Sequence, residues 1–144
     1  MDIIFDIDGT LADCEHRRHF IRTKPKNYEA FHLGAGRDPV IEPVAHVMRT
    51  MLHAGNRVVC CSGRMDTHRD ITERWLLQHN LHPHAIYMRA ADDMRPDDVI
   101  KEELLQKIKQ DGFHPVMAFD DRQRVVDMWR RNGIICAQVA PGDF

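Results

Sequence analysis

The segment DIIFDIDGTLAD, residues 2–13, gives the clearest indication of the fold of this chain. Its apolar residues run almost without interruption over residues 3–7, which is typical of a strand that is covered on both faces of a parallel sheet. Two carboxylates, Asp6 and Asp8, lie one residue apart near the end of this run. Gly9 then permits a tight turn that aims both side chains at one point. The segment therefore predicts a buried strand that carries acidic groups at its carboxyl end.

Apolar runs alternate with amphipathic segments along the whole chain. The runs predict strands at residues 3–7, 57–61, 85–88, 116–119 and 134–139. The amphipathic segments predict helices at residues 42–54, 66–80, 97–110 and 122–131. This alternation indicates an α/β fold, a doubly wound, Rossmann-like parallel sheet of about five strands with right-handed crossovers. Without internal repeats or linkers, residues 1–144 are expected to form a single domain.

Composition narrows the class of protein. The 144 residues carry a formal charge of −2, which gives no overall preference for a polyanionic partner. No apolar run approaches the roughly 20 residues that a membrane span needs, and the N-terminus lacks a signal-type apolar core. The four cysteines have neither a disulfide nor a metal-binding spacing, which suits a reducing compartment. We therefore expect a cytoplasmic protein with no membrane partner.

Polar side chains gather where three of the predicted strands end. Because ligands of doubly wound sheets bind beyond the carboxyl ends of the strands, we expect these groups to converge at one edge. They are, in strand order, Asp6, Asp8 and Thr10, then Ser62 and Arg64 on either side of Gly63, then Asp120 and Asp121.

The segment 14–37 interrupts the alternation and is basic. It carries six positive and two negative residues, a local charge of +4, with interleaved aromatic residues. The basic residues are Arg17, Arg18, Arg22, Lys24, Lys26 and Arg37, and the acidic ones are Glu15 and Glu29. One interpretation is a solvated loop with a few anchoring aromatics. The other, favoured by its position after the acidic residues, is a basic rim that holds a phosphate-rich partner.

The clustered carboxylates predict a cation, because they repel one another at neutral pH. Mg²⁺ prefers a few carboxylates, waters and a phosphate oxygen, and Asp6 and Asp120 could supply the carboxylates. Thr10, Ser62 and Lys101 could hold the remaining phosphate oxygens, although Lys101 by itself equally suits a solvated helix. One carboxylate of DIDGT would attack phosphorus, and the other, kept protonated by the neighbouring negative charge, would protonate the leaving oxygen.

These residues resemble the haloacid dehalogenase (HAD) superfamily of phosphatases, whose first motif reads DxDGT after an apolar strand. DIDGT, Ser62, Lys101 and the Asp120–Asp121 pair match its four motifs in order. The resemblance implies Asp6 as the nucleophile and Asp8 as the acid and base. It implies as Mg²⁺ ligands the carboxylates of Asp6 and Asp120 and the backbone carbonyl of Asp8, with Asp121 as a ligand or as support for one.

A narrower resemblance covers nearly the whole chain. The segments SGRMD, TERWL, YMRAADDMRPDDVIKEE and MAFDDRQRVVDMWRRNGIICAQVAPGDF are similar to the phosphatase domain of the T-even phage type polynucleotide kinase and 3′-phosphatase family. The resemblance implies removal of 3′-phosphates from nucleic acid ends, assisted by Arg17, Arg64 and Asp97. No GxxxxGK[ST] loop occurs here, so kinase activity is not predicted. A separate kinase or ligase as partner, a homo-oligomer, and a chain that is an excised domain all stay open.

The leading hypothesis is therefore a Mg²⁺-dependent polynucleotide 3′-phosphatase that acts on DNA or RNA ends through an aspartyl-phosphate intermediate. About a dozen residues separate Met88 from Lys101, too few for a large cap, so the only expected insertion is the small one after the first strand. Two alternatives remain. One is a phosphatase or nucleotidase for mononucleotides and other small phosphoesters, and the other is a non-catalytic phospho-acceptor signalling module.

Overall fold

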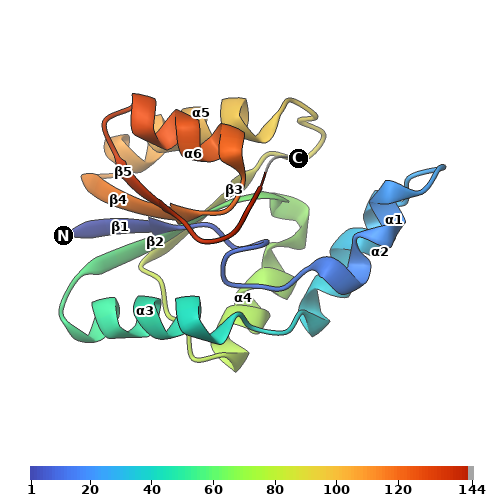
Figure 1. Cartoon of the computed structure of the whole chain (residues 1–144), viewed down its shortest axis with the longest axis horizontal. Helices are drawn as coiled ribbons and strands as arrows, with labels where there is room; N and C mark the ends of the chain where they lie inside the picture. The colour runs from blue at the N-terminus through green and yellow to red at the C-terminus, as the bar shows by residue number, and fades with distance from the viewer. Residues whose placement is uncertain (143–144) are drawn as a thin grey trace.

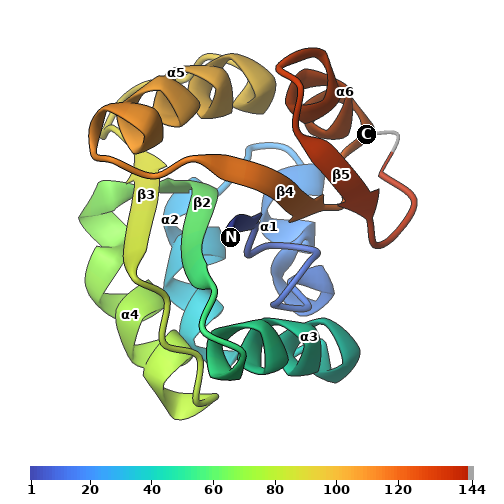
Figure 2. The same cartoon turned by 90° about the vertical axis from the view of Figure 1, so that its left-hand side faces the viewer.

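The computed structural model describes residues 1–142, which form a five-stranded parallel sheet between two layers of helices (Figures 1 and 2). The strand order is β3-β2-β1-β4-β5. The strands are β1 (Asp2–Phe5), β2 (Arg57–Met65), β3 (Ala85–Arg89), β4 (Pro115–Asp120) and β5 (Ile135–Gln138). The chain winds outward in opposite directions from β1, so the switch point lies between β1 and β4. The predicted doubly wound α/β fold is confirmed.

Four helices cover the two faces of the sheet (Figure 2). Helices α3 (Glu42–His53) and α4 (Arg69–Gln78) lie on one face, and α5 (Asp97–Gln110) and α6 (Gln123–Arg131) lie on the other. Alternate residues of β1 pack on opposite faces of the sheet. Ile3 packs in the core under α3 and α4, whereas Ile4 packs in the core under α5 and α6. Burial on both faces is the physical reason for the continuous apolar runs in the sequence.

The strand β2 is longer than the predicted strand at 57–61. It continues to Met65 because Met65 pairs with Arg89 of β3 beyond a register shift that follows Ser62. Ser62 and Arg64 therefore lie inside the last part of a strand and not in a loop after it. The predicted helix at 66–80 is divided into a short 3₁₀ turn, η3 (Asp66–His68), and α4.

The basic segment is helical and projects from the body of the protein. It contains η1 (Glu15–Arg17), α1 (His19–Arg22), α2 (Tyr28–Leu33) and η2 (Gly34–Arg37). Figure 1 shows α1 and α2 extending beyond the carboxyl edge of the sheet. We call residues 15–37 the arm. The interpretation of this segment as a plain loop is wrong, and the arm is the small insertion expected after the first strand.

Two further features of the described residues concern the helices and the cysteines. None of their helices combines the length and the apolar character that crossing a membrane requires. All four cysteines are free and buried, so they contribute to packing.

Candidate active site

Three carboxylates from two neighbouring strands meet at the carboxyl edge of the sheet. Asp6 directly follows β1, Asp120 ends β4, and Asp121 comes next. One oxygen from each lies within 4.8 Å of the others, and all three residues are buried. Asp120 is held by Trp129 Nε1, which donates to its Oδ2 at 3.1 Å, and by the backbone N–H of Asp121, which donates to its Oδ1 at 2.9 Å. The strands, and not a local motif, bring these groups together.

Lys101 supplies a positive charge to this cluster. It lies on α5, and its ammonium donates to Asp6 Oδ1 at 2.7 Å and to Asp120 Oδ2 at 2.9 Å. Burial would lower the pKa of Lys101, but the Asp120 and Asp6 carboxylates raise that pKa well above its ordinary value. Lys101 is thus a buried, charged group and not a solvated helix lysine.

The donor set fits a divalent cation. Burial raises the pKa of Asp6 well above its ordinary value, and the charges of Asp120 and Asp121 add to that effect while Lys101 opposes it. Burial and Asp120 raise the pKa of Asp121 as well. One ammonium therefore does not offset three buried carboxylates, and a second cation would keep them ionised. Oxygen-only ligands of this kind suit a hard divalent ion.

A hydroxyl group lies beside Asp6, and a second is held at the end of β2. Thr10 Oγ1 donates to Asp6 Oδ2 at 3.0 Å, so Thr10 and Lys101 together engage both oxygens of this carboxylate. Ser62 Oγ accepts the backbone N–H of Arg64 at 3.1 Å. In this arrangement Thr10 and Lys101 orient Asp6 itself, whereas the sequence predicted contacts from both residues to phosphate oxygens.

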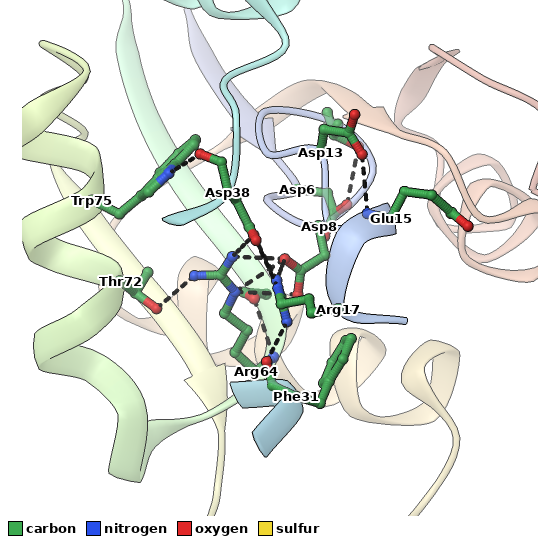
Figure 3. A network of polar contacts seen from close by, with 12 residues as sticks. Asp6, Asp8, Asp13, Glu15, Arg17, Phe31, Asp38, Arg64, Thr72 and Trp75 are labelled. Carbon is green, nitrogen blue, oxygen red and sulfur yellow. Dashed lines mark hydrogen bonds and ion pairs between the residues drawn. The ribbon is translucent and has the colours of Figure 1, made fainter. Parts of the chain in front are cut away.

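The carboxylate of Asp8 turns toward two arginines (Figure 3). Arg17 Nη2 and Arg64 Nη2 both donate to Asp8 Oδ1 at 2.6 Å. Burial would raise the pKa of Asp8, but Arg64 and Arg17 lower that pKa well below its ordinary value. The expectation that a neighbouring negative charge keeps Asp8 protonated is therefore wrong for this arrangement, because the charges beside Asp8 are positive.

Asp38 is a buried residue of the site that the sequence did not reveal. Its carboxylate accepts Arg17 Nε at 2.8 Å, Arg17 Nη2 at 2.7 Å and Arg64 Nη2 at 3.3 Å (Figure 3). Its backbone carbonyl accepts Trp75 Nε1 of α4 at 2.8 Å. Asp38 fixes both arginines beside Asp8. In the sequence, Asp38 is marked only by its place before a proline at the end of the basic segment. An acidic residue before a proline is too common a pattern to identify a site residue.

Asp97 lies beside this site, but it contacts arginines and not the acidic cluster. It begins α5, and its carboxylate forms ion pairs with Arg89 and with Arg122, the latter at 2.8 Å. Arg89 also donates to the backbone carbonyl of Gly63 at 2.9 Å. A side chain at Gly63 would overlap the Asp97 carboxylate, so the end of β2 and the start of α5 approach closely here. Arg89 was not predicted as a site residue.

Gly9 makes the turn after β1 possible in two ways. Its φ of +84° is a left-handed conformation that other residues rarely adopt. A Cβ atom added at Gly9 would also overlap the carboxyl group of Asp121. The absence of a side chain at Gly9 therefore lets the third carboxylate approach the turn that carries Asp6 and Asp8.

Gly9→Ala is expected to destabilise the protein more than Gly55→Ala. Both glycines have positive φ, but a Cβ at Gly55 meets no atom within 4 Å. Gly55→Ala should cost about 1 kcal/mol from backbone strain, and the overlap with Asp121 should add a further ~1–3 kcal/mol at Gly9. Urea unfolding measures both values. Equal losses would show that the Asp121 carboxylate moves aside without cost.

Comparisons with known proteins agree with this geometry. The class that the fold, the site and the family model define is the HAD-like phosphatases, which are hydrolases. The fold is similar to that of the class C acid phosphatase from Bacillus anthracis with tungstate bound, with a TM-score of 0.73 at 12% identity over 99% of this chain and 66% of that one. The family model described as the polynucleotide kinase PNKP phosphatase domain matches residues 1–144. The chain belongs to this family, which confirms the resemblance found in the sequence.

Two solved structures are similar along nearly the whole chain. One is titled the structure of the Pnkp1/Rnl/Hen1 complex, with 35% identity and a TM-score of 0.85. The other is the structure of the Pnkp1/Rnl/Hen1 RNA repair complex, with 34% identity and a TM-score of 0.83. Each comparison covers 99% of this chain but only 47% and 43% of the matched chains, so this chain spans less than half of their length. Membership of a phosphatase family favours an enzyme over the phospho-acceptor alternative.

Proposed function

We propose that this chain is a Mg²⁺-dependent polynucleotide 3′-phosphatase that forms an aspartyl-phosphate on Asp6. The observation that carries the proposal is the orientation of Asp6, whose two oxygens are engaged by Lys101 and Thr10 beside Asp120 and Asp121. A carboxylate fixed in this way can attack phosphorus in line with the leaving oxygen, which splits the hydrolysis into two easier steps.

The metal part of the proposal follows from the acidic cluster. The carboxylates of Asp6 and Asp120 and the backbone carbonyl of Asp8 would hold Mg²⁺, with Asp121 as a further ligand or as support. When bound, the ion would neutralise charge on the transferring phosphoryl group. Lys101, Arg17 and Arg64 would neutralise the rest, and the Ser62 hydroxyl would donate a hydrogen bond to a phosphate oxygen.

Asp8 would act as acid and then as base. The phosphate dianion of the substrate competes with the Asp8 carboxylate for Arg17 and Arg64, and losing these partners lets the pKa of Asp8 rise toward a range where it carries a proton. An Asp6 oxygen then attacks phosphorus, the bond from phosphorus to the 3′-oxygen breaks, and Asp8 gives its proton to that oxygen. Asp8 next takes a proton from water, which attacks phosphorus and releases phosphate from Asp6.

The proposed substrate is a nucleic acid end because the matched family is defined by polynucleotide enzymes, and because only residues 90–96 separate β3 from α5. A segment this short leaves no room there for a cap domain that would exclude a polymer. The Pnkp1/Rnl/Hen1 complexes also support action beside a separate kinase or ligase. The proposed setting is the cytoplasm, and a second copy of the chain is a further expected partner.

The experiment that tests the function compares three substrates with Mg²⁺ present. They are an oligonucleotide with a 3′-phosphate, the same oligonucleotide with a 5′-phosphate, and a 3′-mononucleotide. We expect the highest kcat/KM for the first, loss of turnover with a chelator, and recovery when Mg²⁺ is restored. Preference for the mononucleotide would favour the small-phosphoester alternative, and preference for the 5′-phosphate would refute the proposal.

A further inference from the structure

The base of the arm is fixed to the candidate active site. Arg17, which contacts Asp8, is only 1% exposed, and its Nη1 donates to the backbone carbonyl of Phe31 at 3.1 Å. Its guanidinium also lies 4.3 Å from the centroid of the Phe31 ring. Phe31 of the arm and Asp8 of the active site therefore contact the same arginine. These contacts fix the base of the arm relative to Asp8.

The arm carries three exposed positive charges that no carboxylate of residues 1–142 neutralises. A fourth exposed cation, Arg22, forms an ion pair with Glu15 at 2.6 Å. Lys24, Lys26 and Arg37 are exposed, and within residues 1–142 no carboxylate forms an ion pair with any of them. These cations are available to an external anion without the cost of breaking an internal pair.

An exposed aromatic ring accompanies these charges. Tyr28, the first residue of α2, is 40% exposed although it is large and aromatic. Lys26 Nζ lies 6.0 Å from the centroid of its ring. A cation next to an exposed aromatic face is the combination with which proteins bind single-stranded nucleic acid, since the cation pairs with a phosphate and the ring stacks on a base.

We infer that the arm binds the single strand just upstream of the 3′-phosphate, with Lys24 and Lys26 on backbone phosphates and Tyr28 on a base. This inference rests on the proposed function and adds how the enzyme distinguishes a polymer end from a mononucleotide. A nucleic acid strand whose 3′-phosphate lies at Asp6 can leave the active site by two paths. One runs along the side that Arg17 occupies, and the other runs along the opposite side. The arm has Arg17 at its base and projects beyond the carboxyl edge of the sheet (Figure 1).

The test compares two double variants with the same loss of charge. Lys24→Ala/Lys26→Ala alters the arm, and Lys107→Ala/Lys109→Ala removes two exposed lysines with the same spacing from the last turns of α5, at the opposite end of the strands. Substrates are 3′-phosphorylated oligonucleotides of increasing length and a 3′-mononucleotide. Binding of the unreactive 3′-hydroxyl oligonucleotide is measured over a range of salt concentrations.

We expect the arm variant to lose about tenfold in kcat/KM on the longer oligonucleotides while the mononucleotide changes by less than about twofold. Its slope of log affinity against log salt should fall by about 1.4, because each phosphate contact to a single strand contributes about 0.7. Tyr28→Ala should weaken oligonucleotide binding without changing that slope. The α5 variant should behave as the unmodified protein does.

Three outcomes would overturn the inference. The arm variant could leave the length dependence intact, lose activity equally on both kinds of substrate, or match the α5 variant. If it keeps full oligonucleotide activity but no longer binds an acidic partner protein, the arm is a protein interface. A starting protein that prefers the mononucleotide would instead refute the proposed polymer substrate, so the two failures are distinguishable.

Discussion

Asp6→Asn is expected to reduce turnover by on the order of 10⁴-fold or more, because the substituted amide cannot attack phosphorus to form the covalent intermediate. The change is nearly isosteric. It leaves an oxygen that can still accept Lys101 or Thr10, so the loss should come from chemistry and not from unfolding. Steady-state hydrolysis of a 3′-phosphorylated oligonucleotide measures the effect.

Trapping the intermediate makes this test sharper. Acid quenching during turnover of a substrate with a labelled phosphate should leave label on the unmodified protein and none on Asp6→Asn. Asp13→Asn is the matched control, since Asp13 belongs to the same segment but is exposed, and among residues 1–142 its carboxylate accepts the backbone N–H of Glu15 alone. Normal turnover by Asp6→Asn, or label retained on it, would show that the nucleophile is misassigned.

Asp8→Asn is expected to slow hydrolysis by about 10²–10⁴-fold, the range that general acid–base catalysis typically contributes. The backbone carbonyl proposed to contact Mg²⁺ survives this change, so Mg²⁺ binding should be nearly intact. Asn keeps one oxygen for Arg17 and Arg64, and the two arginines also keep Asp38 as a partner. The site should therefore remain assembled, which circular dichroism and urea unfolding can check.

Substrates with different leaving groups can distinguish a role of Asp8 in proton transfer from a role in holding the site together. A p-nitrophenyl phosphate needs little protonation as its phenolate leaves, so Asp8→Asn should slow its first step far less than that of a 3′-phosphorylated oligonucleotide. An equal loss on both substrates would indicate that Asp8 acts by positioning Arg17 and Arg64. Undiminished turnover would refute the acid role altogether.

The position of Asp8 between two arginines has a consequence for how the site works. Without substrate, the guanidinium groups of Arg17 and Arg64 are held by Asp8 and Asp38. They are thus kept in place beside Asp8. Under the proposed function, an arriving phosphate would exchange one anionic partner for another and meet groups that are already oriented, which would reduce the entropy lost on binding.

The layers of the fold, and the edge of the sheet at which its acidic residues gather, follow from the sequence alone. Continuous apolar runs such as residues 3–7 indicated strands buried on both faces, because only a parallel sheet covered by helices hides every side chain of such a run. Since the strands are parallel, acidic residues at their ends had to meet at one edge, and this placed Asp6 and Asp120 together before any coordinates were known.

Which charges face one another depends on contacts that form only when the chain folds. Asp8 and Asp6 are two residues apart in the sequence, yet Asp6 contacts Lys101 and Asp8 contacts Arg17 and Arg64, so the two carboxyl groups have opposite pKa shifts. Asp38 joined the site through contacts with residues 21 and 26 positions away, and no local pattern encodes such a distance. The local sequence sets where a strand ends and which residues lie at its end. The pKa of a side chain depends instead on its burial and on every charged group near it in space, whatever their distance in the sequence.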